Sequence, residues 1–396
     1  MEHSRQVREI ASINNNQYSK RDNWDEIIYL DTGNVTQGRI SNLQELNPEV
    51  DRVPSRCKRK VKNGSIVYSM VRPNQKHYAI LQNPPSNMLV STGFSVIDAN
   101  TTIVEPEYLY YVLTSQEATE YFNALAEQSA STYPTLNIDD LAAYSVSVPP
   151  LNRQRAIVAI IRAINDKMSI NFAINGYLLE ICQTLFKYYF ADENPVYETK
   201  HVDLAAVASI GAGGDKPSIV SHKRTETTPI PIFSNGADDE GLYGFTTEAQ
   251  IKEESITVSA RGTIGLVNWR CEPYFPIVRL ISVTPIDERI SAKYLYLCLN
   301  NLRIQGAGTT QQQLTVPMFK TQKIAIPSTK VMKSFTAEIT PLFNTLINCK
   351  HECENLSKLR DLLLSKLMSG EIDVSKIDVS QVDATQLNSH LGDHLD

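Results

Sequence analysis

Short segments that recur in one order indicate that this chain contains two copies of a single module. Five pairs resemble each other, first copy against second: ASI at 11–13 and 208–210, SIVYSMVRP at 65–73 and SITVSARGT at 255–263, YLYYVL at 108–113 and YLYLCL at 294–299, ASTYPTL at 130–136 and AGTTQQQL at 307–314, and VSVPPL at 146–151 and IAIPST at 324–329. The separation between copies falls steadily from 197 to 178 residues. Each match is weak alone, but the shared order is hard to obtain by chance, so we predict a tandem duplication.

A long amphipathic helix is predicted to follow the proline that closes each copy, over 151–194 and over 329–370. Its apolar positions alternate at spacings of four and three residues, the pattern of a coiled-coil seam. The first seam comprises Ile157, Ile161, Ile164, Met168, Asn171, Asn175, Leu178 and Leu185, and the second comprises Phe335, Ile339, Leu342, Leu346, Cys349, Cys353, Leu356 and Leu363. We expect Asn152 to cap the first helix and Gly370 to end the second.

Two seams of equal length bury each other most simply as an antiparallel coiled coil. Such a pairing would bring Asn171 and Asn175 level with Cys349 and Cys353. A buried amide at that level would fix the register of the two helices at some cost in stability. The alternative is that each helix packs only against its own globular module.

The predicted fold class is mixed α/β (α+β), with two tandem modules separated by the two long helices. Strand-like runs such as EIIYL, GSIVYSMV and IPIFS alternate with turns rich in glycine, asparagine and proline. The expected organisation is a first module at 1–150, a spacer helix at 151–194, a second module at 195–328, a C-terminal spacer helix at 329–370 and an acidic, flexible tail at 371–396.

The distribution of charge suggests a phosphate-binding surface in the first copy. The whole chain carries a net charge of −6, yet residues 52–76 hold eight basic and no acidic side chains. Clustered cations of this kind are what contact with a nucleic-acid backbone requires, although a solvated face or loop has the same composition. The candidates in this run are Arg56, Lys58, Arg59, Lys60 and Lys62. The cations of the second copy are dispersed: Lys216, Lys223, Arg224, Arg261 and Arg270.

Polar side chains at predicted strand ends and in loops give a second group of candidate DNA contacts. Arginine, glutamine, serine, threonine and tyrosine hydrogen-bond to base edges and phosphates, but they are also ordinary loop residues. The candidates are Ser69, Arg72, Thr132 and Tyr133 in the first copy, and Ser259, Arg261, Thr263, Gln311 and Gln312 in the second.

Motifs of catalytic and metal sites are missing from the sequence. Asn83-Pro84-Pro85-Ser86 resembles a methyltransferase motif but lacks its aromatic residue, so we predict a turn. The segment GAGGD at 211–215 has neither the spacing nor the lysine of a phosphate-binding loop. The six cysteines form no C-x-x-C pair, which indicates reduced thiols in a cytoplasmic protein. We therefore expect neither a catalytic centre nor a bound metal or cofactor.

Several of these segments together resemble the DNA-specificity (S) subunit of type I restriction–modification systems over essentially the whole chain. They are VSVPPLNRQRAIVAII with its long helix, YLYYVL, IPIFSNG followed by GLYGF, SARGTIG, and LLLSKLMSGEIDVS. The resemblance implies two target-recognition domains, each binding one half of a split asymmetric DNA sequence, with an antiparallel coiled coil that sets the gap. It also implies a non-catalytic subunit. Two modification subunits would methylate adenine with S-adenosylmethionine, and restriction subunits would cleave DNA with ATP and Mg²⁺.

The chain departs from the family pattern at the start of both helices. Arg153 stands where the family usually has an acidic residue, and IPSTKVMKSF in the second copy lacks both the second proline and the glutamine that matches Gln154. These departures fall in a structural segment, so they bear on the residue at which each helix begins and not on the function that the resemblance implies.

Apolar residues predicted on the outward faces of the helices are candidate docking positions for the modification subunits: Phe172, Tyr177, Phe186, Leu359 and Leu362. A lone coiled coil would not need them. Two alternatives remain: a specificity subunit of another methylation and cleavage system, and a protein-interaction scaffold that no longer recognises DNA. An active methyltransferase would need to bind S-adenosylmethionine by itself, which we do not expect.

Overall fold

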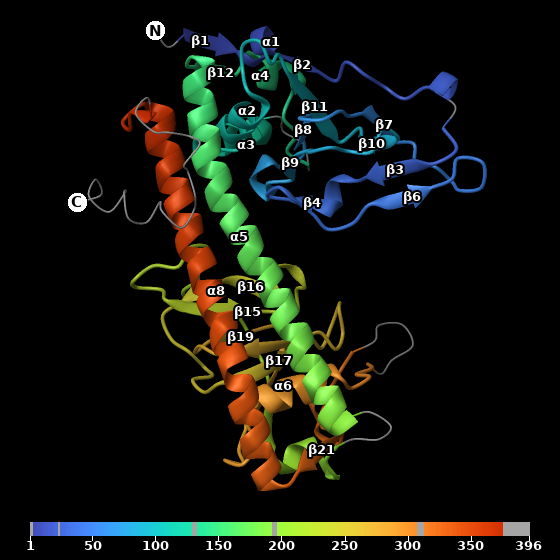
Figure 1. Ribbon diagram of the computed structural model, residues 1–396, viewed down its shortest axis with the longest axis vertical. Helices are drawn as coiled ribbons and strands as arrows, with labels where there is room; N and C mark the ends of the chain where they lie inside the picture. Colours follow the sequence, from blue (N-terminus) through green and yellow to red (C-terminus); the bar gives the residue numbers. More distant parts are fainter. Residues whose placement is uncertain (1–2, 23, 129–132, 192–195, 307–312, 375–396) are drawn as a thin grey trace. The chain divides into compact units, whose positions relative to one another are not determined.

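The computed structural model describes residues 3–22, 24–128, 133–191, 196–306 and 313–374. Its contacts divide the chain into two compact units. The first unit combines Met1–Met168 with Glu354–Asp396, and the second unit is Ser169–Cys353. Each long helix therefore contributes one part to each unit (Figure 1).

The first unit contains two four-stranded sheets and a group of short helices. Its strands are β1 His3–Gln6, β2 Ala11–Ile13, β3 Ile27–Leu30, β4 Val35–Thr36, β5 Arg39–Ile40, β6 Gln44–Leu46, β7 Cys57–Lys60, β8 Ile66–Ser69, β9 Tyr78–Ile80, β10 Met88–Ser91, β11 Phe94–Ala99 and β12 Ser145–Val148. Its short helices are α1 Val7–Ile10, α2 Pro106–Leu113, α3 Gln116–Gln128 and α4 Ile138–Ala143. One sheet has the antiparallel order β2-β11-β8-β9, the other the order β6-β3-β10-β7 with β3 and β10 parallel, and β1 pairs with β12.

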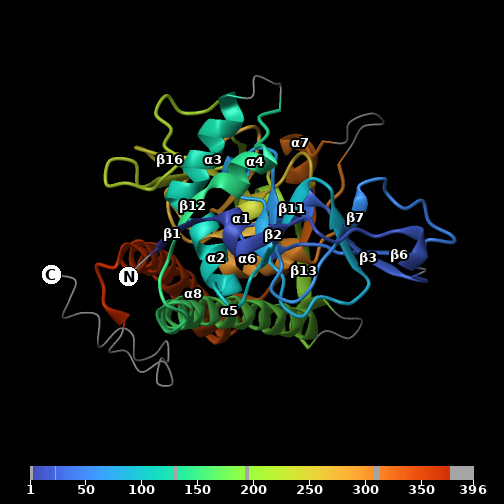
Figure 2. The same ribbon diagram turned by 90° about the horizontal axis from the view of Figure 1, so that it is seen from above.

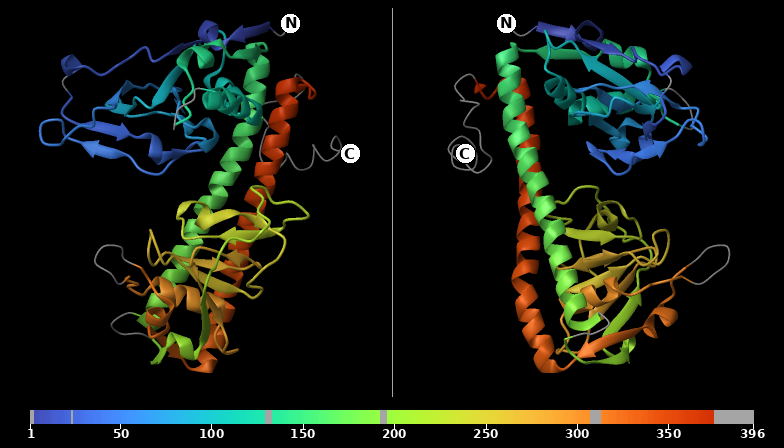
Figure 3. Two further views of the ribbon diagram at one scale, coloured as in Figure 1. Left: turned by 180° about the vertical axis from the view of Figure 1, so that it is seen from behind. Right: turned by 45° about the vertical axis from the view of Figure 1, so that its right-hand side comes forward.

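The second unit repeats this architecture with fewer strands. Its strands are β13 Thr199–Asp203, β14 Ala208–Ala212, β15 Ile230–Phe233, β16 Leu242–Thr246, β17 Ser255–Val258, β18 Val267–Arg270, β19 Phe275–Pro276, β20 Ile281–Pro285 and β21 Lys323–Pro327, and its short helices are α6 Ala292–Asn300 and α7 Val316–Lys320. The sheet order β14-β20-β17-β18 corresponds to β2-β11-β8-β9, and the pair β13-β21 corresponds to β1-β12. The strands of this unit lie on one side of its helix pair (Figure 3).

Equivalent hydrogen bonds confirm the predicted internal repeat. In the first unit the Tyr108 hydroxyl donates to the carbonyl oxygen of Ser147 over 3.0 Å. In the second unit the Tyr294 hydroxyl donates to the carbonyl oxygen of Ala325 over 2.7 Å. Both tyrosines come from the YLY segments that the sequence comparison paired, and both acceptors lie on the strand that precedes a long helix. The two modules therefore share side-chain hydrogen bonds to equivalent backbone positions as well as element order.

The two long helices are α5, Leu151–Phe186, continued by a π turn at Lys187–Ala191, and α8, Thr329–Ser369. In the first unit, Ile157 and Ile164 near the start of α5 share a core with Leu356 and Leu363 near the end of α8. In the second unit the partners are reversed, because the end of α5 packs with the start of α8. The helices are thus antiparallel, as predicted, and lie side by side in each unit (Figures 1 and 2). They also pack on the modules, but each helix contributes to the cores of both units, so the alternative that each packs only against its own module is wrong.

A buried amide lies near the middle of the helix pair in the second unit. Asn171 is 1% exposed, and its Nδ2 donates to Oε2 of Glu352 over 2.7 Å. Cys349 is buried in the same part of α8, whereas Leu178 and Leu342 are half-buried against the core of the second unit. The polar contact of Asn171 is therefore made with the glutamate that precedes Cys353 rather than with a cysteine.

The start of α5 is organised by Gln154 rather than by the expected cap. The helix begins at Leu151, so Asn152 lies inside it, and that prediction was wrong. Gln154 is fully buried and accepts from the N–H of Glu105 over 2.8 Å. Its Nε2 donates to the carbonyl oxygens of Ile103 over 3.1 Å and Pro149 over 2.7 Å. The side chain thereby joins α5 to the loop before α2.

The second copy replaces this polar clamp by an apolar contact. Met332 occupies the position that matches Gln154 and is 2% exposed. The departure noticed in the sequence is therefore a change in how the helix start is packed. At the other end α8 stops at Ser369, and Gly370 has a φ of +81°, which confirms the predicted stop because glycine adopts this left-handed conformation without strain.

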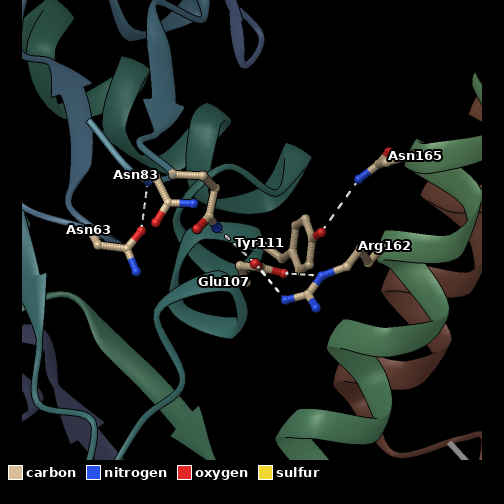
Figure 4. Close-up of polar contacts among 7 residues, drawn as sticks. Asn63, Asn83, Glu107, Tyr111, Arg162 and Asn165 are labelled. Carbon is tan, nitrogen blue, oxygen red and sulfur yellow. Dashed lines mark hydrogen bonds and ion pairs between the residues drawn. The ribbon is translucent and has the colours of Figure 1, made fainter. Parts of the chain in front are cut away.

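Further polar contacts hold α5 to α2 in the first unit (Figure 4). The Arg162 guanidinium contacts the Glu107 carboxylate with a shortest distance of 2.7 Å, and this hydrogen-bonded pairing raises the pKa of Arg162. The same carboxylate accepts from Gln82 over 2.8 Å. Next to Gln82, the N–H of Asn83 donates to Oδ1 of Asn63, and Asn83 has a φ of +47°. The Asn-Pro-Pro-Ser segment is thus a turn, as predicted.

Candidate nucleic-acid interface

In the first unit, the loop after β8 meets the segment that begins at Tyr133. The N–H of Arg72 donates to the carbonyl oxygen of Pro134 over 2.9 Å, and the N–H of Leu136 donates to that of Met70 over 2.7 Å. The guanidinium carbon of Arg72 lies 5.3 Å from the centre of the Tyr133 ring, and Tyr133 is 63% exposed. Because β8 is buried throughout, it anchors the loop, while the Tyr133 ring is exposed and Arg72 is half-buried beside it.

The second unit builds the same meeting point from different side chains. The N–H of Leu314 donates to the carbonyl oxygen of Ala260 over 3.0 Å, the equivalent of the bond between Leu136 and Met70. Arg261 lies on the loop after β17, and its Nη2 is 3.4 Å from Oε1 of Gln313. Arg261 and Thr263 are exposed. Two loops that are far apart in the sequence therefore present an arginine beside an amide at one place.

These two surfaces suit the recognition of nucleic acid. Arginine and glutamine form paired hydrogen bonds with purine edges, and an arginine next to an exposed tyrosine suits contact with phosphates and bases. The backbone is common to the two units, whereas the exposed side chains differ. Such an arrangement can bind two different sequences with one scaffold.

Two of the proposed contact residues, Ser69 and Ser259, are buried rather than exposed at the surface. Ser69 is 4% exposed and Ser259 is 1% exposed. Ser69 ends β8, and its hydroxyl donates to the carbonyl oxygen of Val71 over 3.1 Å. Ser259 directly follows β17, so both residues lie at strand ends as predicted, but their burial contradicts the prediction that they contact DNA. Three other candidates, Thr132, Gln311 and Gln312, lie outside the described residues.

The basic run of the first unit is partly neutralised by acids from other parts of the chain. Lys60 forms an ion pair with Asp22 and lies 5.3 Å from the ring centre of Trp24. The Lys62 ammonium lies 3.8 Å from the Asp98 carboxylate. The sequence count of eight cations without an acid therefore overstates the local charge.

The remaining cations of this run differ in exposure. Arg56 and Lys58 are exposed at and before the start of β7. Arg59 is half-buried, its Nη2 donates to the carbonyl oxygen of Thr92 over 3.3 Å, and burial lowers the pKa of its guanidinium. Arg56 and Lys58 are thus the two cations between 56 and 62 that are best placed to contact phosphates.

Replacing Arg56 and Lys58 together by alanine should weaken DNA binding and its dependence on salt. Each phosphate contact contributes a slope of about 0.9 to the plot of log affinity against log salt concentration, so the slope should fall by about 2. The measurement is a salt titration of duplex binding by the complex with its partner subunits. Lys330 and Lys333, both exposed on α8, form a matched control with the same loss of charge. An equal fall in slope for both pairs would contradict a local contact.

The cations of the second copy lie on several loops. Lys216 bonds to the hydroxyl of Tyr243, and its ammonium lies 4.4 Å from the centre of that ring. Lys223 is exposed. Arg224 lies 2.7 Å from the Glu272 carboxylate. Arg270 is 3% exposed, so it is a structural residue and not part of a surface.

Two residues that were not among the sequence candidates, Asn235 and Arg279, lie in this region of the second unit. Oδ1 of Asn235 accepts from the N–H of Ala260 over 2.7 Å, and its Nδ2 donates to the carbonyl oxygen of Val278 over 2.7 Å. Asn235 therefore ties the Arg261 loop to the turn that carries Arg279. Asn235 lies within the segment IPIFSNG and could have been noticed there, but Arg279 follows an ordinary apolar run and gives no signal.

The predicted docking residues on the helices divide into two groups. Phe172, Tyr177 and Leu362 are exposed by 45%, 67% and 45%, and Leu359 is half-buried against the core of the first unit. Phe186 is only 2% exposed, so its outward placement was wrong. Its ring lies 5.3 Å from that of Tyr294, because the last turn of α5 faces the aromatic core of the second unit.

Within the described ranges, His, Cys, Asp and Glu side chains form no group of three or more that could hold a metal ion. Among the same residues, no helix is both long and apolar enough to cross a bilayer. Cys349 and Cys353 are both buried on α8.

Comparison with known proteins identifies the family. A family model described as the type I restriction modification DNA specificity domain matches residues 3–178 and again residues 198–356. The chain belongs to this family. The two matches of this type I specificity domain correspond to the two modules of the internal repeat, each extended into a long helix.

Related type I specificity proteins cover most of the chain. The specificity subunit of the type I restriction enzyme HindI from Haemophilus influenzae is 26% identical, over 87% of this chain and 94% of that protein. A putative type I specificity subunit from Mycoplasma pneumoniae is 29% identical, over 64% of this chain and 78% of that protein. The solved S subunit of a type I system from M. genitalium has a similar fold, with a TM-score of 0.51 at 16% identity over 93% of this chain and 96% of that one.

Proposed function

We propose that this chain is the specificity subunit of a type I restriction–modification complex and recognises a DNA sequence in two separate halves. Residues 1–150 and 195–328 act as target-recognition domains, and residues 151–194 and 329–370 act as spacer helices. The acidic tail from residue 371 takes no part in DNA contact. The chain itself carries out no catalytic step.

The observation that carries this proposal is one backbone scaffold whose equivalent loops carry two different sets of polar side chains. Arg72 with Tyr133 in the first unit and Arg261 with Gln313 in the second unit occupy equivalent loops. Because the side chains differ, the two half-sites should differ as well. Membership of the type I specificity family supports the same conclusion.

The helices provide the spacing between the half-sites in this proposal. At about 1.5 Å per residue, the 36 residues of α5 extend roughly 54 Å. Two modules that bind one face of B-DNA need centres about 34–36 Å apart, or a multiple of this. A continuous helix of this length is stiff enough to hold such a separation.

The catalytic steps belong to partner subunits in this proposal. Two modification subunits bind S-adenosylmethionine and methylate adenine, and restriction subunits use ATP and Mg²⁺ to cleave DNA in the cytoplasm. Exposed apolar residues on the helices, Phe172, Tyr177 and Leu362, together with the half-buried Leu359, are the candidate docking positions. Large exposed apolar side chains of this kind commonly mark protein–protein contacts.

A methylation map tests the proposal directly. The chain is co-expressed with its modification subunit in a host without DNA methylation, and N6-methyladenine is mapped by long-read sequencing. We expect a split motif of two unlike halves around a fixed gap of unspecified sequence. Replacing residues 196–328 by the same segment of another specificity subunit should change one half and leave the other half and the gap unchanged.

Two results would contradict parts of this proposal. A continuous motif would show that one module does not recognise DNA or that the helices do not set a gap. Absence of methylation in a complex whose assembly has been demonstrated would favour the interaction scaffold instead. A scaffold would also lack the steep loss of DNA affinity with rising salt that phosphate contacts produce.

A further inference from the structure

The turn between β19 and β20 has a strained backbone. Val278 has a φ of +53° and Arg279 has a φ of +63°, both in the left-handed region. This region is costly for any residue with a Cβ atom, and a β-branched valine there is a genuine outlier. Such strain persists only where the surrounding structure imposes it, and it concentrates at functional sites.

Three hydrogen bonds to backbone groups of this turn hold it in place. The N–H of Val278 donates to the carbonyl oxygen of Gly214 over 2.9 Å, and that of Arg279 donates to the carbonyl oxygen of Gly213 over 2.8 Å. Asn235 donates to the carbonyl oxygen of Val278 over 2.7 Å. A Cβ atom on Gly213 would lie 2.6 Å from backbone atoms of Pro276 and Ile277. The GAGGD segment is therefore needed for this close approach of two backbones.

The strained turn places Arg279 beside a surface hollow. The hollow has a volume of about 380 Å³, and its lining includes the polar residues Arg279, Gln313 and Thr315 and the apolar residues Ile281 and Leu314. Arg279 is exposed, and its guanidinium makes no ion pair or hydrogen bond to any side chain or backbone group of the described residues. A planar cation with no partner among the described residues, an amide and a hydroxyl thus belong to the lining of one hollow.

We propose that this hollow recognises a purine base edge of the half-site bound by the second unit, with Arg279 as the residue that determines specificity. The inference rests on the proposed function and names the position in the second unit that selects the base. Guanine presents N7 and O6 as adjacent acceptors in the major groove, and arginine donates to both at once. Gln313, whose amide oxygen is held by Arg261, is placed to contact the neighbouring base.

The corresponding turn of the first unit has a different sequence. There, β10 and β11 are joined through Thr92 and Gly93, without an arginine on the turn itself. Both β10 and β19 lie parallel to the first strand of their small sheets, which makes the two turns equivalent. The base selected through Arg279 therefore belongs to the second half-site alone.

The test compares methylation maps of the assembled complex containing Arg279→Ala or Arg279→Lys. The half-site bound by the second unit is the one that changes when residues 196–328 are exchanged. At one base pair of that half-site, the preference for the correct base over the other bases should fall about 5- to 150-fold, the range for losing one bidentate contact. Lysine keeps the charge but not the fork of donors, so it should also relax that position. Arg289→Ala is the matched control, because Arg289 is exposed in the same unit and bonds to Asp287.

The outcomes separate this inference from the proposed function. Alanine and arginine have the same conformational cost in a left-handed backbone, so the Arg279→Ala variant should have the melting temperature of the unaltered chain. A change in its methylation map would then not result from misfolding. If the unaltered chain gives a split motif and both Arg279 variants methylate that same motif with full discrimination, the inference fails alone. Equal weakening at every sequence, measured by DNA binding, would reveal a phosphate contact and would also overturn it. Absence of a split motif for the unaltered chain refutes the proposed function instead.

Discussion

Replacing Gln154 by alanine is expected to destabilise the first unit by about 3–4 kcal/mol, because three buried backbone groups lose their partner. These groups are the N–H of Glu105 and the carbonyl oxygens of Ile103 and Pro149. Gln154 is fully buried, so water does not replace its contacts without opening the structure. The loss should loosen the junction between α5 and α2.

Hydrogen exchange of peptides from 96–113 and 145–160 measures this effect, because it reports local opening without requiring two-state unfolding of the whole chain. Gln116, an exposed glutamine on α3, provides the control, and Gln116→Ala should change stability by less than about 0.5 kcal/mol. Gln154→Met introduces the residue of the second copy and should remain destabilising, since its thioether cannot replace the three hydrogen bonds. Equal protection from hydrogen exchange in Gln154→Ala and Gln116→Ala would refute the stabilising role of the Gln154 hydrogen bonds.

Replacing Arg270 by alanine is expected to destabilise the second unit by about 3 kcal/mol, through lost charged hydrogen bonds and a cavity. The guanidinium is 3% exposed and stacks on Phe233, with its central carbon 3.6 Å from the ring centre. It donates to Oγ1 of Thr257 over 3.0 Å, and to the carboxylate and the carbonyl oxygen of Glu240 over 3.0 and 2.6 Å. Burial lowers the pKa of this guanidinium, opposed by the Glu240 charge.

Arg270 also connects β18 to α8 through Glu240. The Lys350 ammonium lies 3.1 Å from Oε2 of the same carboxylate. Hydrogen exchange of peptides from 238–246 and 255–270 should therefore rise in Arg270→Ala, and less in Arg270→Lys, which keeps the charge. Arg224→Ala removes an exposed ion pair with Glu272 and should cost at most about 1 kcal/mol. A similar small effect for Arg270→Ala would show that the buried contacts contribute little net stability.

Much of the fold could be predicted because it depends on local patterns that recur. Four of the five pairs of duplicated segments lie on equivalent strands and helices, the pair 130–136 and 307–314 falling mostly outside the described residues, and the heptad spacing lies on α5 and α8. Burial follows the predicted seam at Ile157, Ile164, Leu356 and Leu363. Periodicity of apolar residues determines which face of a helix is buried, so it survives folding almost unchanged.

The candidate interface was less predictable because it depends on contacts between distant segments. The charge of the 52–76 run changes when Asp22 and Asp98 approach it, and no count along the chain contains that information. Phe186 lies on a helix whose outward face changes as it enters the core of the second unit. Local composition cannot foresee either effect.

The sequence by itself determined the duplication, the two spacer helices and membership of the type I specificity family, because each of these is written as an ordered pattern along the chain. Tertiary structure alone decided which side chains reach the surface together. Arg279 and Gln313 are 34 residues apart, and only the close approach of Gly213 to β19 and the left-handed turn beside it bring them to one hollow. Backbone packing of this kind depends on the shape of the whole unit, which a one-dimensional pattern does not contain.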